Sequence, residues 1–181
     1  PRLWFRTGYP YGIGPYNHGV SHLAFGPDGK LYVSSGSRTD GAEPGTDPRL
    51  GTMGETPVTA CLWRFDPEAR DPQPEIISRG IRNAWSFAWT GAGELFTVSN
   101  GPDAHACEEM DFITPPVAGG AVEHHGFPYQ FEDWPVGRKA YPHTQDAPVG
   151  AHFVPPVKNL GPAGVPPAGR TCRCFTGSRQ P

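Results

Sequence analysis

The sequence GIRNAWSFAWTGAGELFTVSNGPD, which runs from Gly80 to Asp103, predicts a β-hairpin. It contains two short apolar runs, Trp85–Trp89 and Leu95–Val98, with Gly91 and Gly93 between them. Aromatic and β-branched residues on both sides of a glycine turn are typical of two tightly joined antiparallel strands. The stretch therefore favours an all-β fold.

Polar residues stand at both outer ends of this hairpin. Arg82 and Asn83 lead into the first strand, and Gly101-Pro102 follows the second. Because the entrance of the first strand and the exit of the second lie at one end of an antiparallel hairpin, we expect Arg82, Asn83 and the Gly101-Pro102 backbone to face one another. A cation, an amide and exposed carbonyls on one edge predict the floor of a polar ligand site.

A second hairpin of the same form lies upstream. The sequence HLAFGPDGKLYVSS, His22 to Ser35, aligns with SFAWTGAGELFTVS, Ser86 to Ser99, at a constant offset of 64 residues. Four-stranded units that recur along a sequence are the mark of β-propeller blades, and long loops stretch their usual period of about 40–50 residues. The repeat predicts equivalent inner strands of adjacent blades; the alternative is two unrelated hairpins with similar turns.

Further short apolar runs extend both units. Leu62–Asp66 and Glu75–Ser78 are predicted to be the third and fourth strands of the first unit, and Met110–Ile113 the third strand of the second. Ser37–Thr59 is predicted to be a long loop, a class that is usually functional or disordered inside a compact domain. From Pro135 onward the pattern places no element. We expect aromatic side chains to form the hydrophobic faces of the blades, namely Phe25, Tyr32, Trp63, Phe87, Trp89 and Phe96.

Composition narrows the class of protein. The 181 residues include 24 glycines and 23 prolines, but the 12% aromatic content argues against a disordered chain. The net charge of −3 has no basic stripe, which excludes nucleic acid as an expected partner. No apolar run approaches the roughly 20 residues of a membrane-spanning helix. The opening Pro1-Arg2-Leu3-Trp4 is unlike a signal peptide and predicts a fragment.

Several short sequences, taken together and in order, resemble a known family. They are His18–Gly36, Arg82-Asn83, Asn100–Asp103 with Glu108-Glu109 after it, and His125–Tyr129. The combination is similar to the soluble pyrroloquinoline-quinone-dependent sugar dehydrogenases of the glucose, sorbosone and pyranose type. That resemblance implies a six-bladed β-propeller of which this chain would form a partial propeller of about two to three four-stranded blades. It also implies an exported, periplasmic or secreted protein that oxidises sugars with quinone and calcium at the channel mouth.

The resemblance also implies roles for particular residues. His18 matches the catalytic base, which takes the proton from the sugar hydroxyl, and a neutral imidazole is suited to that step. Arg82 matches the arginine that holds the quinone oxygens, and Asn83 the adjoining amide contact. The carbonyls of Gly101 and Pro102 match those that bind Ca²⁺, a cation that prefers oxygen ligands. A difference lies just before His18, where the family often has an acidic residue and this chain has Asn17.

Structural alternatives stand beside each of these roles. His18 could be an ordinary loop histidine, Arg82-Asn83 a strand-capping pair, and Gly101-Pro102 a plain turn. His124-His125 is expected to be structural. A transition-metal site is disfavoured for one acidic, histidine- and cysteine-containing cluster because it mixes hard and soft ligands without a zinc spacing. That cluster consists of Asp103, His105, Cys107, Glu108 and Glu109.

The sequence predicts two regions and leaves two other functions open. Residues 1–160 are assigned to the propeller fragment, and residues 161–181 to a disordered or foreign tail. The pairing of Cys61 and Cys107 stays open. The first alternative to an enzyme is a non-catalytic propeller that binds a protein or glycan partner, since hedgehog-interacting proteins resemble the same propeller family. The second is a truncated, inactive product; the substrate and the electron acceptor are not predicted.

Overall fold

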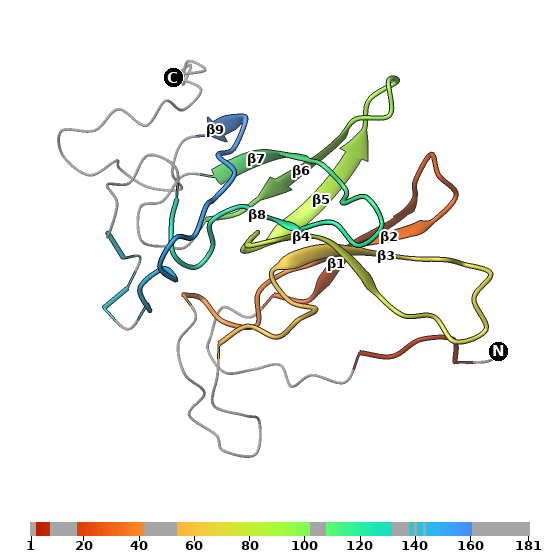
Figure 1. The fold of residues 1–181 in the computed structure, drawn as a ribbon, viewed down its shortest axis with the longest axis horizontal. Helices are drawn as coiled ribbons and strands as arrows, with labels where there is room; N and C mark the ends of the chain where they lie inside the picture. Colours follow the sequence, from red (N-terminus) through yellow and green to blue (C-terminus); the bar gives the residue numbers. More distant parts are fainter. Residues whose placement is uncertain are drawn as a thin grey trace, which may run out of the picture.

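The computed structural model describes residues 3–7, 18–41, 54–101, 108–131, 138–139, 141–142 and 144–160. Within these ranges the chain is all-β, with strands and turns and no helix (Figure 1). No helix there is long and apolar enough to cross a membrane. The strands are β1 (Val20–Phe25), β2 (Leu31–Ser35), β3 (Cys61–Phe65), β4 (Glu75–Arg79), β5 (Ala84–Trp89), β6 (Leu95–Ser99), β7 (Glu108–Ile113), β8 (Glu123–His124) and β9 (Lys158–Leu160).

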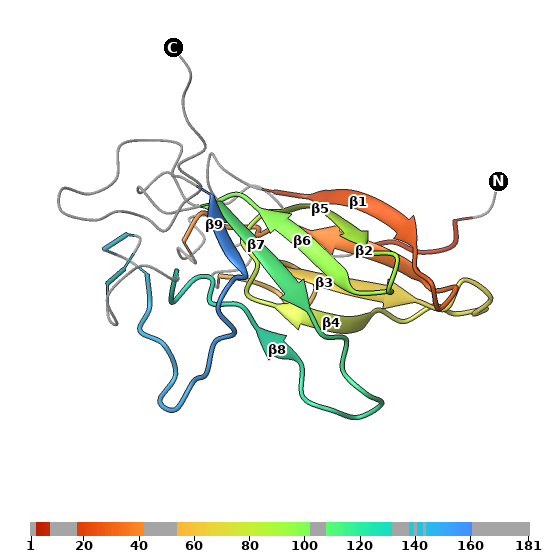
Figure 2. The ribbon, with the colours of Figure 1, turned by 90° about the horizontal axis from the view of Figure 1, so that it is seen from above.

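These strands form two sheets that lie as adjacent layers (Figure 2). The first has the order β1-β2-β3-β4-β8 and the second β5-β6-β7-β9. Consecutive strands pair antiparallel within β1 to β4 and within β5 to β7, as in the meander of a propeller blade. We call the β1–β4 meander blade 1 and the β5–β6–β7–β9 sheet blade 2. The prediction of a partial propeller is confirmed.

The 64-residue repeat holds in the register of the two hairpins. In blade 1 Val20 pairs with Ser35, and in blade 2 Ala84 pairs with Ser99. Both hairpins have a register shift at the same place, after the first strand residue. Their turns match too, because Gly29 and Gly93 have positive φ values of 75° and 84°. Such values suit glycine, which lacks the Cβ that would clash. The prediction of equivalent hairpins is confirmed.

The main core lies between the two blades. Buried side chains of blade 1 meet buried side chains of blade 2, and half-buried Ala24 and Trp89 pack against them. Tyr32 and Trp89 stack edge to face with ring centroids 4.9 Å apart. The buried members of this core are Tyr32, Leu62, Ile77, Ile81, Ala84, Phe87, Leu95 and Ile113. Alternation along the strands places the strand residues of this set on the inter-blade side, and Ile81 joins them from the connection between β4 and β5.

The other face of blade 1 is only partly covered. Phe5, from the extended segment 3–7, packs on Phe65 with ring centroids 4.4 Å apart. Val33, Cys61 and Trp63 are buried in the same cluster. This cluster does not cover β1, where 66% of the Phe25 surface is exposed.

Two short strands were not predicted. β8 pairs in parallel with β4 through Ser78–Glu123 and Arg79–His124. β9 is the fourth strand of blade 2 and pairs with β7. It comes from the proline- and glycine-rich region in which the sequence pattern placed no element. The predicted tail, residues 161–181, lies outside the described residues.

Candidate functional site

The starts of β1 and β5 and the ends of β2 and β6 meet at one edge of the two blades, which we call the rim. Ser37, just after β2, joins them through its backbone. Its N–H donates to the carbonyl of Arg82 at 2.6 Å, and its carbonyl accepts from the N–H of His18 at 2.8 Å. The equivalent hairpin ends therefore bring His18 and Arg82 to one place, although 64 residues separate them.

The Arg82 side chain is buried, with 5% of its surface exposed. Its Nη1 donates to the carbonyl of Gly101 at 2.8 Å and to that of Asn100 at 3.2 Å. Its Nε donates to the carbonyl of Asp40 at 3.1 Å, and its Nη2 forms an ion pair with the Asp40 carboxylate. Four of the five guanidinium N–H groups thus bind protein acceptors. Arg82 ties the loop after β2 to the end of β6.

The loop after β2, residues 37–41, is held in place by Glu55. The Glu55 carboxylate accepts from the backbone N–H of Arg38 at 2.9 Å, from that of Thr39 at 3.1 Å, and from the Thr39 hydroxyl. Burial raises the pKa of Glu55 because it removes water from the charged form, while the hydrogen bonds from Thr39 oppose this rise. Glu55 therefore fixes the loop that presents Asp40 to Arg82.

His18 is half-buried at the same rim. Its Nδ1 lies 3.1 Å from the hydroxyl of Ser37, which is fully buried. The Ser37 hydroxyl also donates to the carbonyl of Thr39 at 2.6 Å. The imidazole is therefore oriented by the same loop that contacts Arg82.

Asn83 and Gly36 form the floor of the rim. Asn83 is buried, and its N–H donates to the Ser99 hydroxyl at 3.2 Å. A Cβ on Gly36 would collide with the Cβ of His18 and lie 3.2 Å from Oδ1 of Asn83. Glycine at this position lets His18 and Asn83 approach the end of β2.

The predicted site residues thus lie close together where the structure describes them. The Gly101 N–H donates to the Glu108 carboxylate at 3.0 Å, and its carbonyl accepts from Arg82. Pro102 and most of the acidic and cysteine-containing cluster after it lie outside the described residues. Among described residues, no group of three His, Cys, Asp or Glu side chains could hold a metal ion.

Sequence reasoning missed Ser37, Asp40 and Glu55. All three lie in the long loop between β2 and β3, where no periodicity marks a residue as important. The length of that loop was the available signal, since long loops in compact domains are usually functional.

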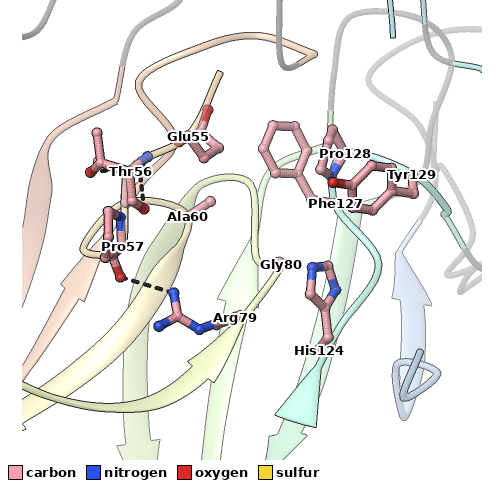
Figure 3. Close-up of a pocket in the computed structure, with 11 residues that line it drawn as sticks. Glu55, Thr56, Pro57, Ala60, Arg79, Gly80, His124, Phe127, Pro128 and Tyr129 are labelled. Atoms are coloured by element: carbon pink, nitrogen blue, oxygen red, sulfur yellow. Dashed lines mark hydrogen bonds between the residues drawn. The ribbon is translucent and has the colours of Figure 1, made fainter. Parts of the chain in front are cut away.

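A pocket of about 340 Å³ lies beside Glu55, between the 55–60 segment and the turn after β8. His124, Phe127 and Tyr129 stand on one side of it, across from Thr56, Pro57 and Ala60 (Figure 3). Burial, with the nearby His125 and Arg79, lowers the pKa of His124 to about 4. The imidazole is therefore neutral near pH 7, and its Nδ1 accepts from the Gly126 N–H at 3.1 Å.

His125, the next residue, does not line this pocket and is buried. Its Nδ1 lies 3.4 Å from Oδ1 of Asp111 on β7, and both side chains are 1% exposed. Neither side chain has a hydrogen bond to another described residue. This burial agrees with the structural role that the sequence led us to expect for His125. The contact with Asp111 was not predicted.

The fold of the chain is similar to part of each of two solved structures. The PQQ-bound form of an aldose sugar dehydrogenase from Streptomyces coelicolor is 21% identical, with a TM-score of 0.50, over 85% of this chain and 38% of that chain. A putative oxidoreductase of the glucose dehydrogenase type from Thermus thermophilus is 24% identical, with a TM-score of 0.50, over 88% of this chain and 42% of that chain. The chain thus spans about two fifths of the length of these proteins.

No curated protein matches the chain. The family model for glucose/sorbosone dehydrogenases matches residues 10–157, which include both blades and the rim between them. With its repeated hairpins and a match over most of its length, the chain belongs to the glucose/sorbosone dehydrogenase family.

Proposed function

We propose that this chain forms part of a pyrroloquinoline-quinone- and calcium-dependent dehydrogenase that oxidises sugars. The observation that carries the proposal is the rim, where Ser37 is hydrogen-bonded to both His18 and Arg82 and the Arg82 side chain donates to the Gly101 carbonyl. A base can take the proton of a sugar hydroxyl, a fixed cation can stabilise developing negative charge, and a carbonyl oxygen can ligate Ca²⁺. Because the chain spans only part of its relatives, the activity belongs to the complete propeller.

The rim residues fit such a cofactor on one side. Arg82 retains one Nη2 N–H without a partner among described residues, and that group could donate to an anionic oxygen. The Gly101 carbonyl has a second lone pair besides the one that accepts from Arg82, and a carbonyl oxygen is a ligand that Ca²⁺ accepts. Asn83 lies beside these groups and would supply an amide contact.

In this proposal the protein places the substrate and moves one proton. His18 takes the proton from the sugar hydroxyl, as neutral imidazole can at neutral pH. Arg82, held by Asp40, keeps a positive charge where negative charge develops. The bound quinone would supply the hydride acceptor, and its calcium ion the polarising charge.

The proposal is tested by His18→Gln in the complete propeller. We expect turnover to fall by about 10²–10⁴-fold, the usual cost of losing a general base, with quinone affinity nearly unchanged. His152→Gln, at an exposed histidine, is the matched control and should leave both properties unchanged. Wild-type turnover in the His18 variant would exclude His18 as the base.

A quinone titration separates this function from a propeller that only binds a protein or glycan. Binding of quinone with Ca²⁺, monitored by fluorescence of the complete propeller, supports the enzyme. A propeller that binds neither would be a binding module or an inactive product. On the family resemblance we also propose an exported location, and recovery of the protein only in the cytoplasmic fraction would contradict it.

A further inference from the structure

Ser37 makes four hydrogen bonds at the rim, and it is 0% exposed. Two backbone bonds connect it to His18 and to Arg82. Its hydroxyl lies 2.6 Å from the carbonyl of Thr39 and 3.1 Å from Nδ1 of His18. A residue in this position controls how the imidazole is placed relative to the guanidinium.

The protons of this hydroxyl can be counted. A serine hydroxyl has one proton to donate, and a carbonyl oxygen can only accept. The 2.6 Å contact with the Thr39 carbonyl therefore uses the Ser37 proton. The Ser37 oxygen can then only accept from His18, so His18 must carry its proton on Nδ1. In neutral imidazole this leaves the lone pair on Nε2.

The Thr39 carbonyl is held in place by the same loop. Glu55 binds the backbone N–H of Thr39 and its hydroxyl, and the next residue, Asp40, is paired with Arg82. The acceptor of the Ser37 proton therefore cannot turn away without breaking the contacts that fix Arg82. The orientation of the hydroxyl is set by the fold of the loop.

We propose that Ser37 is a positioning residue that holds His18 in the Nδ1–H tautomer, with Nε2 as the atom that accepts the substrate proton. This inference rests on the proposed function, because it assigns an atom to the base of that reaction. The residue that it adds, Ser37, is neutral, and its hydroxyl proton is already donated to the Thr39 carbonyl. Unlike a carboxylate, it fixes the tautomer without adding a negative charge beside the imidazole.

The direct test is the ring ¹⁵N spectrum of His18 in the complete propeller without quinone. We expect a protonated Nδ1 and an unprotonated Nε2 in the wild-type protein near neutral pH. Ser37→Ala should shift the spectrum toward a mixture of tautomers, and Ser37→Thr, which keeps a hydroxyl, should restore the wild-type pattern. Ser34→Ala is the matched control, since it removes another buried hydroxyl that binds the His22 N–H and not His18.

Enzyme kinetics with quinone and Ca²⁺ are the second test of the role of Ser37. Ser37→Ala should lower kcat by about tenfold, the equivalent of roughly 1.4 kcal/mol, with little change in KM. Ser34→Ala should not lower kcat. A general loss of structure would affect both variants and would leave the tautomer of the folded fraction unchanged.

The outcomes separate this inference from the proposed function. A wild-type His18 protonated on Nε2, or a Ser37→Ala protein with an unchanged tautomer and kcat, overturns the role of Ser37 even if the enzyme is active. An Nδ1–H tautomer in a protein without any turnover supports the tautomer assignment and contradicts the proposed function. The wild-type spectrum decides the tautomer even if the Ser37 variants fail to fold.

Discussion

At the scale of single residues, Arg82 has a structural task before any catalytic one. Its charge is buried, and burial of an unpaired charge is costly. Asp40 and the carbonyls of Asn100 and Gly101 satisfy most of its donors. The arginine that the sequence singled out as a cofactor contact therefore also holds the rim together.

Arg82→Met should destabilise the complete propeller by about 3 kcal/mol, because the mostly buried Asp40 carboxylate would lose its ion pair with the guanidinium. The free energy of unfolding in denaturant measures this loss. The double variant Arg82→Met/Asp40→Leu should recover part of it, since neither charge of this pair then stays buried. Additive losses in the double variant would show that the two side chains do not interact.

Gly36 is the second residue on which the rim depends. Gly36→Ala would place a Cβ against the Cβ of His18, so we expect a loss of about 1–3 kcal/mol in stability and a lower turnover. Gly91→Ala is the control, because nothing lies within 4 Å of a Cβ there. Thermal unfolding and turnover of the two variants make the comparison. Equal behaviour of both would contradict the close approach of β2 and His18.

At the scale of elements, β8 closes the outer edge of blade 1 and carries a histidine that titrates below its usual range. His124 has a folded pKa of about 4 against 6.5 for a free side chain, mainly because burial disfavours the charged form. Between these values the unfolded chain binds more protons than the folded one. The contribution of neutral His124 to stability is therefore full above pH 6.5 and is lost as the pH falls toward 4.

The fold should thus lose stability between pH 6.5 and 4, and His124→Gln should make this part of the pH profile flatter. Protonation would also place a proton on the Nδ1 that accepts from Gly126. The unfolding midpoint as a function of pH is the measurement, with His152→Gln as the exposed control. If the unfolding midpoint of the His124 variant fell with pH as steeply as that of the wild type, groups other than His124 would cause the loss of stability in acid.

At the scale of the whole molecule, two blades leave apolar surface and a strand edge open. Leu23 and Phe25 on β1 are 56% and 66% exposed, and Trp85 on β5 is 62% exposed. β1 pairs only with β2 in its sheet, so its other edge offers free backbone groups among the described strands. Open apolar faces and edges promote association. In a propeller, neighbouring blades cover such faces.

We therefore expect these 181 residues, expressed alone, to aggregate and to bind quinone and calcium weakly or not at all. Light scattering and a thermal shift assay with quinone and Ca²⁺ test this. A monomeric chain that melts cooperatively and is stabilised by the cofactor would contradict the expectation. Phe25→Lys should reduce the aggregation if the open face of β1 causes it.

The sequence by itself determined the hairpins and their repetition. Strand alternation and glycine turns act between residues close in the chain, so His22–Ser34 and Ser86–Val98 could be predicted to pair in the same way. The ends of such hairpins are fixed by the same local geometry. That is why Arg82, Asn83 and Gly101 were expected on one edge, where the structure places them.

Only the tertiary structure decided which loop residues meet at that edge. Asp40 contacts Arg82 across 42 residues, and Glu55 reaches Thr39 from the far end of a loop without periodicity. The pairing of β8 with β4, and the burial of Asp111 beside His125, likewise depend on how the blades pack. Contacts of this kind form when separate elements exclude water from a shared surface, and no local pattern in the chain encodes them.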